Sequence, residues 1–347
     1  MINAKGYAAH SKTDALQPWD FERRELSADD VLIDILYCGI CHSDIHQVRS
    51  EWGPAIYPIV PGHEIVGRIT AVGANVSKFK VGELAGIGCM VNACQHCDSC
   101  NHGQEQFCDN KQTVWTYNSR DKDGSVTYGG YSDKIVCDQH FVLHVSDKLD
   151  LKGVAPLLCA GITTYSPLRK WKVGKGHRVG VLGLGGLGHM AVKFAVSFGA
   201  EVTMLSTSPS KEADAKRLGA HKFVLTKDPV QVKNLDRYFD FIIDTVSAPH
   251  DYNMYLQMLK TNGVQICVGL PPEPLSIAGG SLMRGNRVLT ASSIGGIPET
   301  QEMLDYCAEH NIVSDIELID IKDVNAAYER VLKSDVKYRF VIDLATI

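Results

Sequence analysis

Four cysteines within a short segment form the clearest metal-binding pattern in this chain of 347 residues. They are spaced C-x2-C-x2-C-x7-C and are Cys94, Cys97, Cys100 and Cys108. Four thiolates at this spacing can surround one tetrahedral Zn²⁺, and a shell made only of sulfur is typical of a structural zinc site. Iron–sulfur clusters use related spacings, but the polar residues between these cysteines indicate an exposed lobe instead. We therefore expect a structural zinc ion, which would stabilise a segment with little hydrophobic core of its own.

Three further residues, far apart in the sequence, are candidate ligands of a second zinc ion. They are Cys41, His63 and Cys159, and Glu64 directly follows the histidine. Two thiolates and one imidazole leave the fourth position on Zn²⁺ open for water or a substrate oxygen, which is the pattern of a catalytic site. The residue pattern alone leaves alternatives open, because Cys159 could be an ordinary buried cysteine and His63 a hydrogen-bonded loop histidine.

A glycine-rich turn of the form G-x-G-x-x-G lies between a strand-like run at 177–182 and a helix-like run at 189–198. This position favours a dinucleotide site, although a tight turn without a ligand could have the same composition. Gly183 allows the turn, Gly185 lets the backbone approach a pyrophosphate, and Gly188 permits close packing of the helix on the strand. The first N–H groups of the helix would bind the phosphates. The turn consists of Gly183, Leu184, Gly185, Gly186, Leu187 and Gly188.

The segment after the second strand-like run, 201–206, distinguishes the two nicotinamide cofactors. NAD sites usually place Asp or Glu there, where it accepts hydrogen bonds from the ribose hydroxyls. Here no carboxylate is present to repel a 2′-phosphate, while several hydroxyl groups and one ammonium group can bind it. Ser208 or Ser210 could instead cap the following helix, and both roles are compatible. We expect NADP(H), bound by Ser206, Thr207, Ser208 and Lys211.

The predicted secondary structure that must position these residues changes along the chain. Short strand-like runs at 31–37, 65–72 and 135–137, separated by Gly and Pro, predict a compact and largely β domain first. From about residue 157 strand-like runs alternate with helix-like runs, which predicts a parallel sheet covered by helices. Further strands are expected at 223–225, 239–244, 263–270 and 287–292, with helices at 211–218 and 298–310. We therefore expect an α/β protein with two domains.

Composition argues against several classes of function. Lys and Arg number 35 against 40 Asp and Glu, for a net charge of −5, and no basic block indicates binding to nucleic acid or to an anionic membrane. The chain shows no signal-peptide pattern and no apolar stretch that could span a bilayer, so we expect a cytoplasmic protein. Eleven cysteines in such a chain indicate metal binding rather than disulfides. We assign no chemistry to the remaining cysteines, Cys38, Cys89, Cys137, Cys267 and Cys307.

Over essentially its whole length the chain resembles the zinc-dependent medium-chain dehydrogenases. The resemblance lies in the motif Gly62-His63-Glu64-x2-Gly67-x5-Gly73-x2-Val76, together with the cysteine motif and the glycine turn in the expected order. Four segments are similar to the cinnamyl alcohol dehydrogenase branch of this family, at 38–44, 115–118, 158–166 and 337–340. The resemblance implies a GroES-like, mostly β catalytic domain at 1–153, to which 294–347 returns, and a Rossmann domain with a doubly wound parallel sheet at 154–293.

The resemblance also implies roles for single residues of the metal centre. Cys41, His63 and Cys159 would bind catalytic zinc, and Glu64 would stand beside them as a supporting carboxylate or an alternate ligand. Asp44 would orient the imidazole of His63, and such a contact usually affects how strongly a histidine binds its metal.

Other residues would, by the same resemblance, contact substrate and cofactor. Ser43 would hydrogen-bond the reacting oxygen and His46 would be the outer member of a proton relay, although Ser43 could cap a helix and His46 could be a surface histidine. Thr163 would lie near the nicotinamide and Arg339 near the pyrophosphate. The substrate pocket would differ from that of relatives, because Ser293 replaces a phenylalanine and a tryptophan replaces a smaller aliphatic residue. The residues that would line it are that tryptophan, Trp52, for which a core or interface role is the alternative, and Trp115.

Together these interpretations predict a zinc- and NADP(H)-dependent alcohol dehydrogenase, or aldehyde reductase, with two zinc ions per chain. Hydride would pass between the nicotinamide and primary alcohols or aldehydes, with aryl and medium-chain substrates favoured over ethanol. A homodimer is expected from the resemblance. The complete set of zinc ligands argues against a zinc-free quinone reductase, and a non-catalytic module that binds zinc and a dinucleotide is the remaining alternative.

Overall fold

The computed structural model describes residues 1–347, which form two compact units. One unit consists of Met1–Cys159 together with Gly295–Ile347, and the other of Ala160–Ile294. The first boundary was expected after residue 153 and lies after Cys159 instead. The reason is that Leu151–Val154 (α3) and Ala155–Leu158 (η3) pack on strands of the first unit. Cys159 therefore belongs to the unit that holds the other candidate ligands of the second zinc ion.

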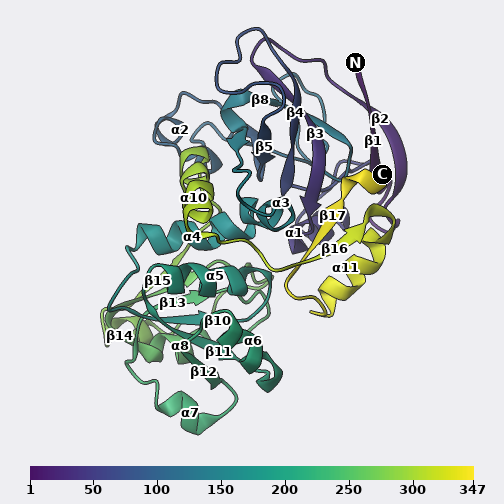
Figure 1. Ribbon diagram of the computed structural model, residues 1–347. Coiled ribbons are helices and arrows are strands. Elements are labelled where there is room, and N and C mark those ends of the chain that lie inside the picture. Colours follow the sequence, from purple (N-terminus) through teal and green to yellow (C-terminus); the bar gives the residue numbers. More distant parts are fainter. The chain divides into compact units, whose positions relative to one another are not determined.

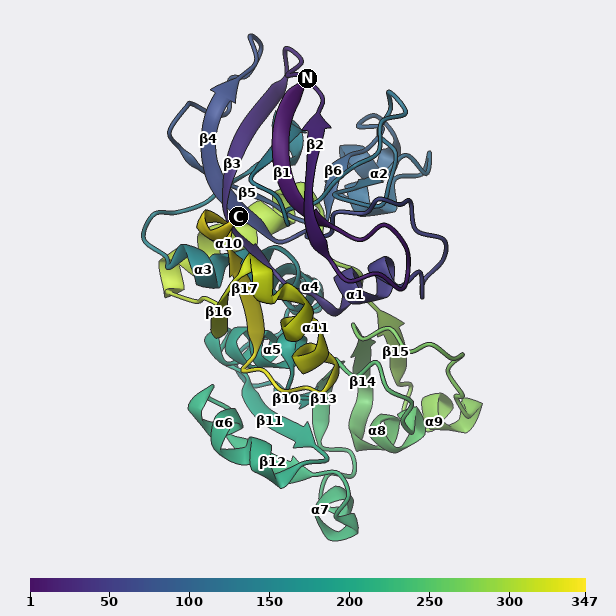
Figure 2. The same ribbon diagram turned by 90° about the vertical axis from the view of Figure 1, so that its right-hand side faces the viewer.

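A seven-stranded sheet forms the core of the first unit. Its strands are β3 (Asp30–Gly39), β4 (Ile65–Val72), β5 (Leu84–Ile87), β8 (Lys134–Asp138), β9 (Leu143–His144), β16 (Ile316–Asp320) and β17 (Arg339–Asp343). The order is β16-β17-β3-β4-β5-β9, with β8 paired to β3. In β3 alternate side chains such as Val31, Ile33 and Ile35 are buried, as one face of a strand requires. Antiparallel pairing of β17 with β3 brings the C-terminal segment into this sheet, where Figures 1 and 2 draw it in yellow beside purple β3.

Shorter elements complete the first unit. Two strand pairs lie outside the large sheet, β1 (Ile2–Ala8) with β2 (Gln17–Arg23) and β6 (Met90–Asn92) with β7 (Val114–Trp115). The other elements are α1 (His42–Val48), α2 (Asp98–Asn101), α10 (Ile297–His310), α11 (Val324–Leu332), η1 (Glu105–Phe107), η2 (Gln139–Phe141), η5 (Ile321–Asp323) and η6 (Leu344–Thr346). Because α11 packs against α1, the C-terminal segment supports the helix that carries several candidate site residues.

Six parallel strands form the sheet of the second unit. The strands are β10 (Arg178–Leu182), β11 (Glu201–Ser206), β12 (Lys222–Leu225), β13 (Phe239–Asp244), β14 (Leu259–Cys267) and β15 (Val288–Ala291). Their order, β12-β11-β10-β13-β14-β15, reverses direction between β10 and β13. Ligands of such doubly wound sheets bind beyond the carboxyl ends of the strands at this switch point. The remaining elements are α4 (Ala160–Lys170), α5 (Gly186–Ser197), η4 (Pro209–Lys211), α6 (Glu212–Arg217), α7 (Pro229–Lys233), α8 (Tyr252–Met258) and α9 (Gly279–Met283).

The expected α/β fold is confirmed, with a β-rich first unit and a parallel sheet in the second. One strand differs from its expected range of 263–270. It begins at Leu259 because a register shift lets that residue pair with Phe239 before the regular ladder starts at Val264. It ends at Cys267 because the next two backbone N–H groups both bond the carbonyl of Asp244, which turns the chain. None of the helices combines the length and the apolar character that crossing a membrane requires.

Candidate metal centres and cofactor edge

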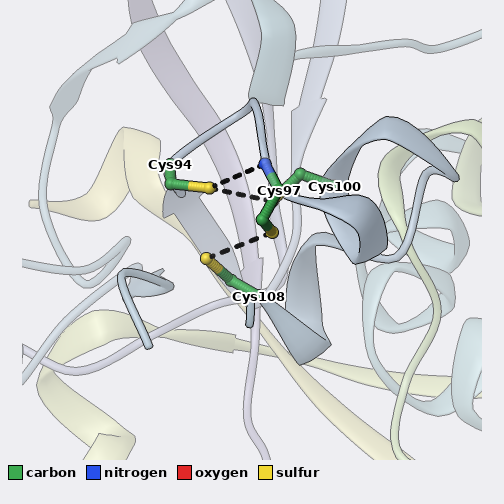
Figure 3. A group of neighbouring side chains, drawn as sticks. All are labelled: Cys94, Cys97, Cys100 and Cys108. Carbon is green, nitrogen blue, oxygen red and sulfur yellow. Dashed lines mark hydrogen bonds between the residues drawn. The ribbon is translucent and has the colours of Figure 1, made fainter. Parts of the chain in front are cut away.

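The four cysteines of the C-x2-C-x2-C-x7-C motif converge in an exposed lobe that contains α2 and η1. Their sulfur atoms all lie within 4.8 Å of one another, with Sγ–Sγ distances of 3.7 Å for Cys94–Cys100 and 3.9 Å for Cys97–Cys108. The backbone N–H of Cys97 points at Sγ of Cys94 over 3.3 Å (Figure 3). Such N–H groups stabilise thiolates, the form of cysteine that binds metal. The closed all-sulfur set fits a tetrahedral structural zinc ion.

Glu105 fixes this lobe to the rest of the first unit, a role that the sequence analysis did not identify. Its carboxylate is buried and accepts a hydrogen bond of 3.0 Å from the backbone N–H of Ile297, the first residue of α10. The other oxygen lies 2.9 Å from Nε2 of His140. Burial raises the pKa of Glu105, but these partners outweigh burial and hold the pKa below its ordinary value. The carboxylate is therefore charged and fully engaged between the lobe and α10.

Cys41, His63, Glu64 and Cys159 form the second cluster, with ligand atoms that also lie within 4.8 Å of one another. All four are buried. Cys41 precedes α1, the His63–Glu64 pair precedes β4, and Cys159 follows η3. Strand β3 leads into α1 and pairs with β4, and η3 packs on both strands, so the sheet brings these distant segments together. The structure thus places Cys41, His63 and Cys159 together, which the residue pattern alone could not decide.

Asp44 supports this cluster from a position with no solvent exposure. Its carboxylate accepts hydrogen bonds from the backbone N–H groups of Cys41 at 2.8 Å and Gly62 at 3.2 Å. Its Oδ1 also lies 3.2 Å from Nδ1 of His63. This contact engages Nδ1 and leaves Nε2 of His63 as the atom that can bind a metal. Since Cys41 and Asp44 form the N-terminal capping box of α1, the alternative that Ser43 caps this helix is wrong.

The electrostatics of the cluster favour a divalent cation. Sγ of Cys41 and Sγ of Cys159 are 3.9 Å apart, and hydrogen bonding between them lowers the pKa of Cys41 well below its ordinary value while raising that of Cys159. Burial raises the pKa of Glu64 to about 7, although the guanidinium of Arg339 pairs with one carboxylate oxygen. The other oxygen, Oε2, is buried without a hydrogen-bond partner. Two cysteine sulfurs, one imidazole and an unpartnered carboxylate oxygen are donors that suit Zn²⁺.

Ser43 and His46 lie on α1 beside this cluster. The hydroxyl of Ser43 lies 3.5 Å from Sγ of Cys41, so it stands next to a candidate metal ligand. The imidazole of His46 stacks on Trp52 with 4.7 Å between ring centroids, and its Nδ1 lies 2.5 Å from Oε2 of Glu51. Glu51 was not identified from the sequence, because nothing in the spacing shows that the chain folds back onto α1. The contact gives the imidazole of His46 a carboxylate partner.

The segment around Trp115 lies along the same cluster. Tyr117 stacks on the imidazole of His63 with 5.8 Å between centroids, and Thr116 donates its N–H to the carbonyl of Cys89 over 3.1 Å. A hydrogen bond with Cys159 lowers the pKa of Cys89, so this thiol belongs to the surroundings of the cluster. Cys89, to which the sequence analysis assigned no chemistry, lies beside a candidate metal ligand. Neither Trp52 nor Trp115 is a core residue, since 46% and 42% of their surfaces are exposed.

The glycine-rich turn occupies the end of β10 and the start of α5, at the switch point of the second unit. Gly183 has a φ of +89°, which favours glycine, and a Cβ on Gly188 would come within 1.9 Å of the carbonyl oxygen of Gly183. A Cβ on Gly185 would meet no atom within 4 Å, so the backbone there is open to a ligand. No side chain caps α5, which leaves its first N–H groups for an anion.

The segment after β11 presents hydroxyl groups without using them as helix caps. Ser206 Oγ accepts a hydrogen bond of 3.1 Å from the N–H of Ser208, whose own hydroxyl lies 2.8 Å from that of Ser210. Ser208 occupies the N-cap position of η4, but its side chain makes no cap hydrogen bond, and Lys211 is the N-cap residue of α6. Neither Ser208 nor Ser210 therefore caps a helix with its hydroxyl. Thr207 is exposed beside these serines.

Two further candidates for cofactor contacts lie in different units. Thr163 is buried in the first turn of α4, in the second unit. Arg339 lies in the first unit, where its guanidinium binds Glu64 of the metal cluster. The expected place of Arg339 near the pyrophosphate stays a prediction. Its position at the cluster shows that it also balances the charge of Glu64.

These features define a class of protein. A mostly β unit with a four-cysteine lobe and an open Cys–His–Cys metal centre, combined with a doubly wound sheet that carries a dinucleotide turn, is the plan of a zinc-binding dehydrogenase. Comparison with known proteins agrees. Residues 27–147 match the family described as "Alcohol dehydrogenase GroES-like domain", and residues 186–309 match "Zinc-binding dehydrogenase".

Similar proteins span the chain from end to end. An NADP-dependent alcohol dehydrogenase of Mycolicibacterium smegmatis is 52% identical over 347 residues, covering 100% of this chain and 99% of the relative. A cinnamyl alcohol dehydrogenase structure from Sorghum bicolor has a TM-score of 0.96 at 45% identity, covering 99% and 98% of the two chains. One from Helicobacter pylori, in complex with NADP(H), has a TM-score of 0.93 at 46% identity, covering 99% of each. The chain belongs to the zinc-dependent medium-chain alcohol dehydrogenase family, in the cinnamyl alcohol dehydrogenase branch.

Proposed function

We propose that this alcohol dehydrogenase interconverts primary alcohols and aldehydes with NADP(H), and that it prefers aryl and medium-chain substrates to ethanol. The observation that carries the proposal is the buried cluster of Cys41, His63 and Cys159, with the hydroxyl of Ser43 beside it. Three protein ligands leave one position open for a substrate oxygen, as catalytic rather than structural zinc requires. The four-cysteine lobe holds the second, structural zinc ion.

When bound at this cluster, Zn²⁺ supplies a Lewis acid that polarises the substrate oxygen, and the nicotinamide supplies the hydride chemistry. The protein side chains orient the reacting groups and move the proton. Asp44 fixes the imidazole of His63 so that its Nε2 faces the metal position. The hydroxyl of Ser43 donates a hydrogen bond to the substrate oxygen and exchanges a proton outward toward His46. Glu51 holds the imidazole of His46 in place through the contact of its Oε2 with Nδ1.

The preference for NADP(H) is supported by the segment after β11. The hydroxyls of Ser206, Thr207 and Ser208 and the ammonium group of Lys211 offer donors to a 2′-phosphate. The first carboxylate after β11 is Glu212, inside α6, so no negative charge ends the strand where an NAD site would place one. The bound NADP(H) of the Helicobacter pylori relative agrees with this assignment.

The substrate preference is supported by two exposed indole rings. Trp52 reaches the site through its stacking on His46, and Trp115 adjoins the residues that contact His63 and Cys89. Large aromatic surfaces gain more from contact with aryl or long alkyl groups than from the two carbons of ethanol. The test compares kcat/KM for benzyl alcohol, cinnamyl alcohol and ethanol. A value for ethanol that equals those of the aryl alcohols would contradict the preference.

We also infer a cytoplasmic homodimer. The strand β15 forms one edge of the parallel sheet, and exposed edges of this kind are commonly covered by a second copy of the chain. Light scattering of the purified protein measures its mass directly, and a monomer would contradict the dimer. Fractionation of the producing cells tests the compartment.

The direct test of the reaction is the absorbance of the reduced nicotinamide while benzaldehyde is mixed with enzyme. We expect a rapid loss with NADPH, a slow loss with NADH, and none after a chelator has removed zinc. No loss with either cofactor from zinc-loaded protein would favour the non-catalytic alternative. Equal rates with both cofactors would contradict the role of the segment after β11.

A further inference from the structure

The fully buried carboxylate of Asp44 has a hydrogen-bond partner beyond the metal cluster, the hydroxyl of Tyr131. This hydroxyl donates to Oδ2 of Asp44 over 3.1 Å, and the same oxygen accepts the N–H of Cys41. The opposite oxygen, Oδ1, faces the N–H of Gly62 and Nδ1 of His63. A charged carboxylate without water depends on such donors, and loss of one leaves part of its charge unsatisfied. The Tyr131 hydroxyl on Oδ2 therefore affects the position of Oδ1 relative to Nδ1 of His63.

Tyr131 has no solvent exposure, and the backbone around it is fixed to the segment that leads into His63. Its N–H donates to the carbonyl of Pro61 over 2.9 Å, and the N–H of Gly130 donates to the carbonyl of Gly62 over 2.9 Å. A Cβ on Gly62 would lie only 2.7 Å from the ring of Tyr131, which shows how closely the two segments pack. This close packing restrains the ring, whose hydroxyl points at Asp44.

A second tyrosine continues this chain of hydrogen bonds. The hydroxyl of Tyr328, on α11, donates to the hydroxyl of Tyr131 over 3.5 Å. Tyr117, whose ring stacks on His63, also interacts with Asp44. Burial, and next the negative charge of Asp44, raises the pKa of all three phenols well above its ordinary value. The phenols stay protonated, and the direction of donation runs from Tyr328 to Tyr131 to Asp44.

We propose that Tyr131 is a positioning residue of the catalytic metal centre. Its hydroxyl holds the carboxylate of Asp44 in the orientation that fixes the imidazole of His63, and Tyr328 restrains that hydroxyl from α11. The inference rests on the proposed catalytic zinc site at Cys41, His63 and Cys159. It links the C-terminal segment of the chain to the metal ligands of the first unit.

The test compares Tyr131→Phe with two matched variants that lose the same atom. Tyr328→Phe removes the outer hydroxyl of the chain, and Tyr128→Phe removes a half-buried hydroxyl only three residues from Tyr131. Each protein is loaded with zinc, and the release of both zinc ions to a chromogenic chelator is followed with time. The four-cysteine site serves as an internal reference, because no hydrogen bond connects it to Tyr131. Cobalt at the catalytic site adds a spectrum that reports the ligand geometry.

We expect Tyr131→Phe to release one of its two zinc ions about tenfold faster than the wild type, at the low end of what loss of a partner to a ligand costs. Its cobalt spectrum should change, and kcat should fall while KM for NADPH stays constant. Tyr328→Phe should show a smaller acceleration, and Tyr128→Phe none. Wild-type release from Tyr131→Phe would overturn the proposal, as would equal acceleration of both zinc ions, which indicates general loosening.

Two further results distinguish failure of the Tyr131 proposal from failure of the catalytic zinc site on which it rests. A wild-type protein that binds only one zinc ion would contradict the catalytic site itself rather than the role of Tyr131. If Tyr131→Phe does not fold, Tyr328→Phe decides the question, since it leaves every direct donor to Asp44 in place. Release from Tyr328→Phe at the wild-type rate would then overturn the proposal.

Discussion

Glu105 offers a quantitative test of how the four-cysteine lobe is held. Replacement by Ala removes the carboxylate that accepts from the N–H of Ile297 at 3.0 Å and contacts Nε2 of His140 at 2.9 Å. Replacement by Gln keeps the shape, because its carbonyl can still accept from Ile297 and its amide can donate to His140. The two variants therefore separate loss of the contacts from loss of the charge.

The magnitude follows from these two contacts. Hydrogen bonds to a charged group contribute about 1.5–3 kcal/mol each, and part of this is offset because the alanine variant no longer buries a charge. We expect Glu105→Ala to lower the free energy of unfolding by about 2–4 kcal/mol and Glu105→Gln by about 1 kcal/mol. For a unit of this size the alanine variant should melt roughly 5–15 °C lower.

The assay is thermal unfolding of the zinc-loaded proteins, followed by circular dichroism. Asp98→Asn is the matched control, because Asp98 lies in the same lobe but is 88% exposed, and its contact with His102 is a surface pair. It should melt within about one degree of the wild type. If Glu105→Ala also melts there, the reasoning about this buried carboxylate is wrong.

The same carboxylate predicts a dependence on pH. Its pKa in the folded protein is below the ordinary value of 4.5, so its contribution is present above pH 4.5 and is lost as the pH falls through the folded pKa. The stability difference between wild type and Glu105→Gln should therefore shrink in acid. A difference that stays constant from pH 6 down to about pH 3 would contradict the assignment.

Three other predictions follow from single residues. Cys100→Ser should lose one zinc ion and melt at a lower temperature, and an unchanged melting temperature would refute the structural role of the lobe. Gly188→Ala should weaken binding of NADPH by at least about tenfold in a fluorescence titration, because its Cβ would collide with the carbonyl of Gly183 at 1.9 Å; unchanged affinity would contradict the role of the turn. Burial lowers the pKa of His250, but hydrogen bonds to Asp244 and to the carbonyl of Ala248 raise it above 6.5, so its contribution to stability is full below pH 6.5 and is lost as the pH rises through the folded pKa. The stability advantage of wild type over His250→Asn, measured by urea unfolding, should accordingly decrease from pH 6 to pH 9, and an increase would refute it.

The sequence predicted those sites whose residues lie within one short segment. Cys94, Cys97, Cys100 and Cys108 lie within one short segment, so their spacing already indicates a shared metal site. The glycine turn is equally local, since the same few residues end a strand, turn and begin a helix. The periodicity of buried strands such as β3 and β10 likewise predicted the two sheets.

The rest depended on contacts between distant segments. Residue types made Cys41, His63 and Cys159 candidate ligands, but their spacing left alternatives open, because only the pairing of β3 with β4 and the packing of η3 bring them together. Glu51 and Glu105 have ordinary sequence surroundings, and their partners are defined by how loops return to α1 and α10. The boundary at Cys159 differs from the expected one because packing of α3 and η3, rather than their composition, assigns them to the first unit.

The most direct test of the central claim is the zinc content and turnover of Cys159→Ala. The wild type should hold two zinc ions per chain and oxidise NADPH with benzaldehyde. The variant should hold one zinc ion, bind NADPH with unchanged affinity and show no turnover above background. A variant that retains both zinc ions and its activity would contradict the assignment of Cys41, His63 and Cys159 as the catalytic metal site.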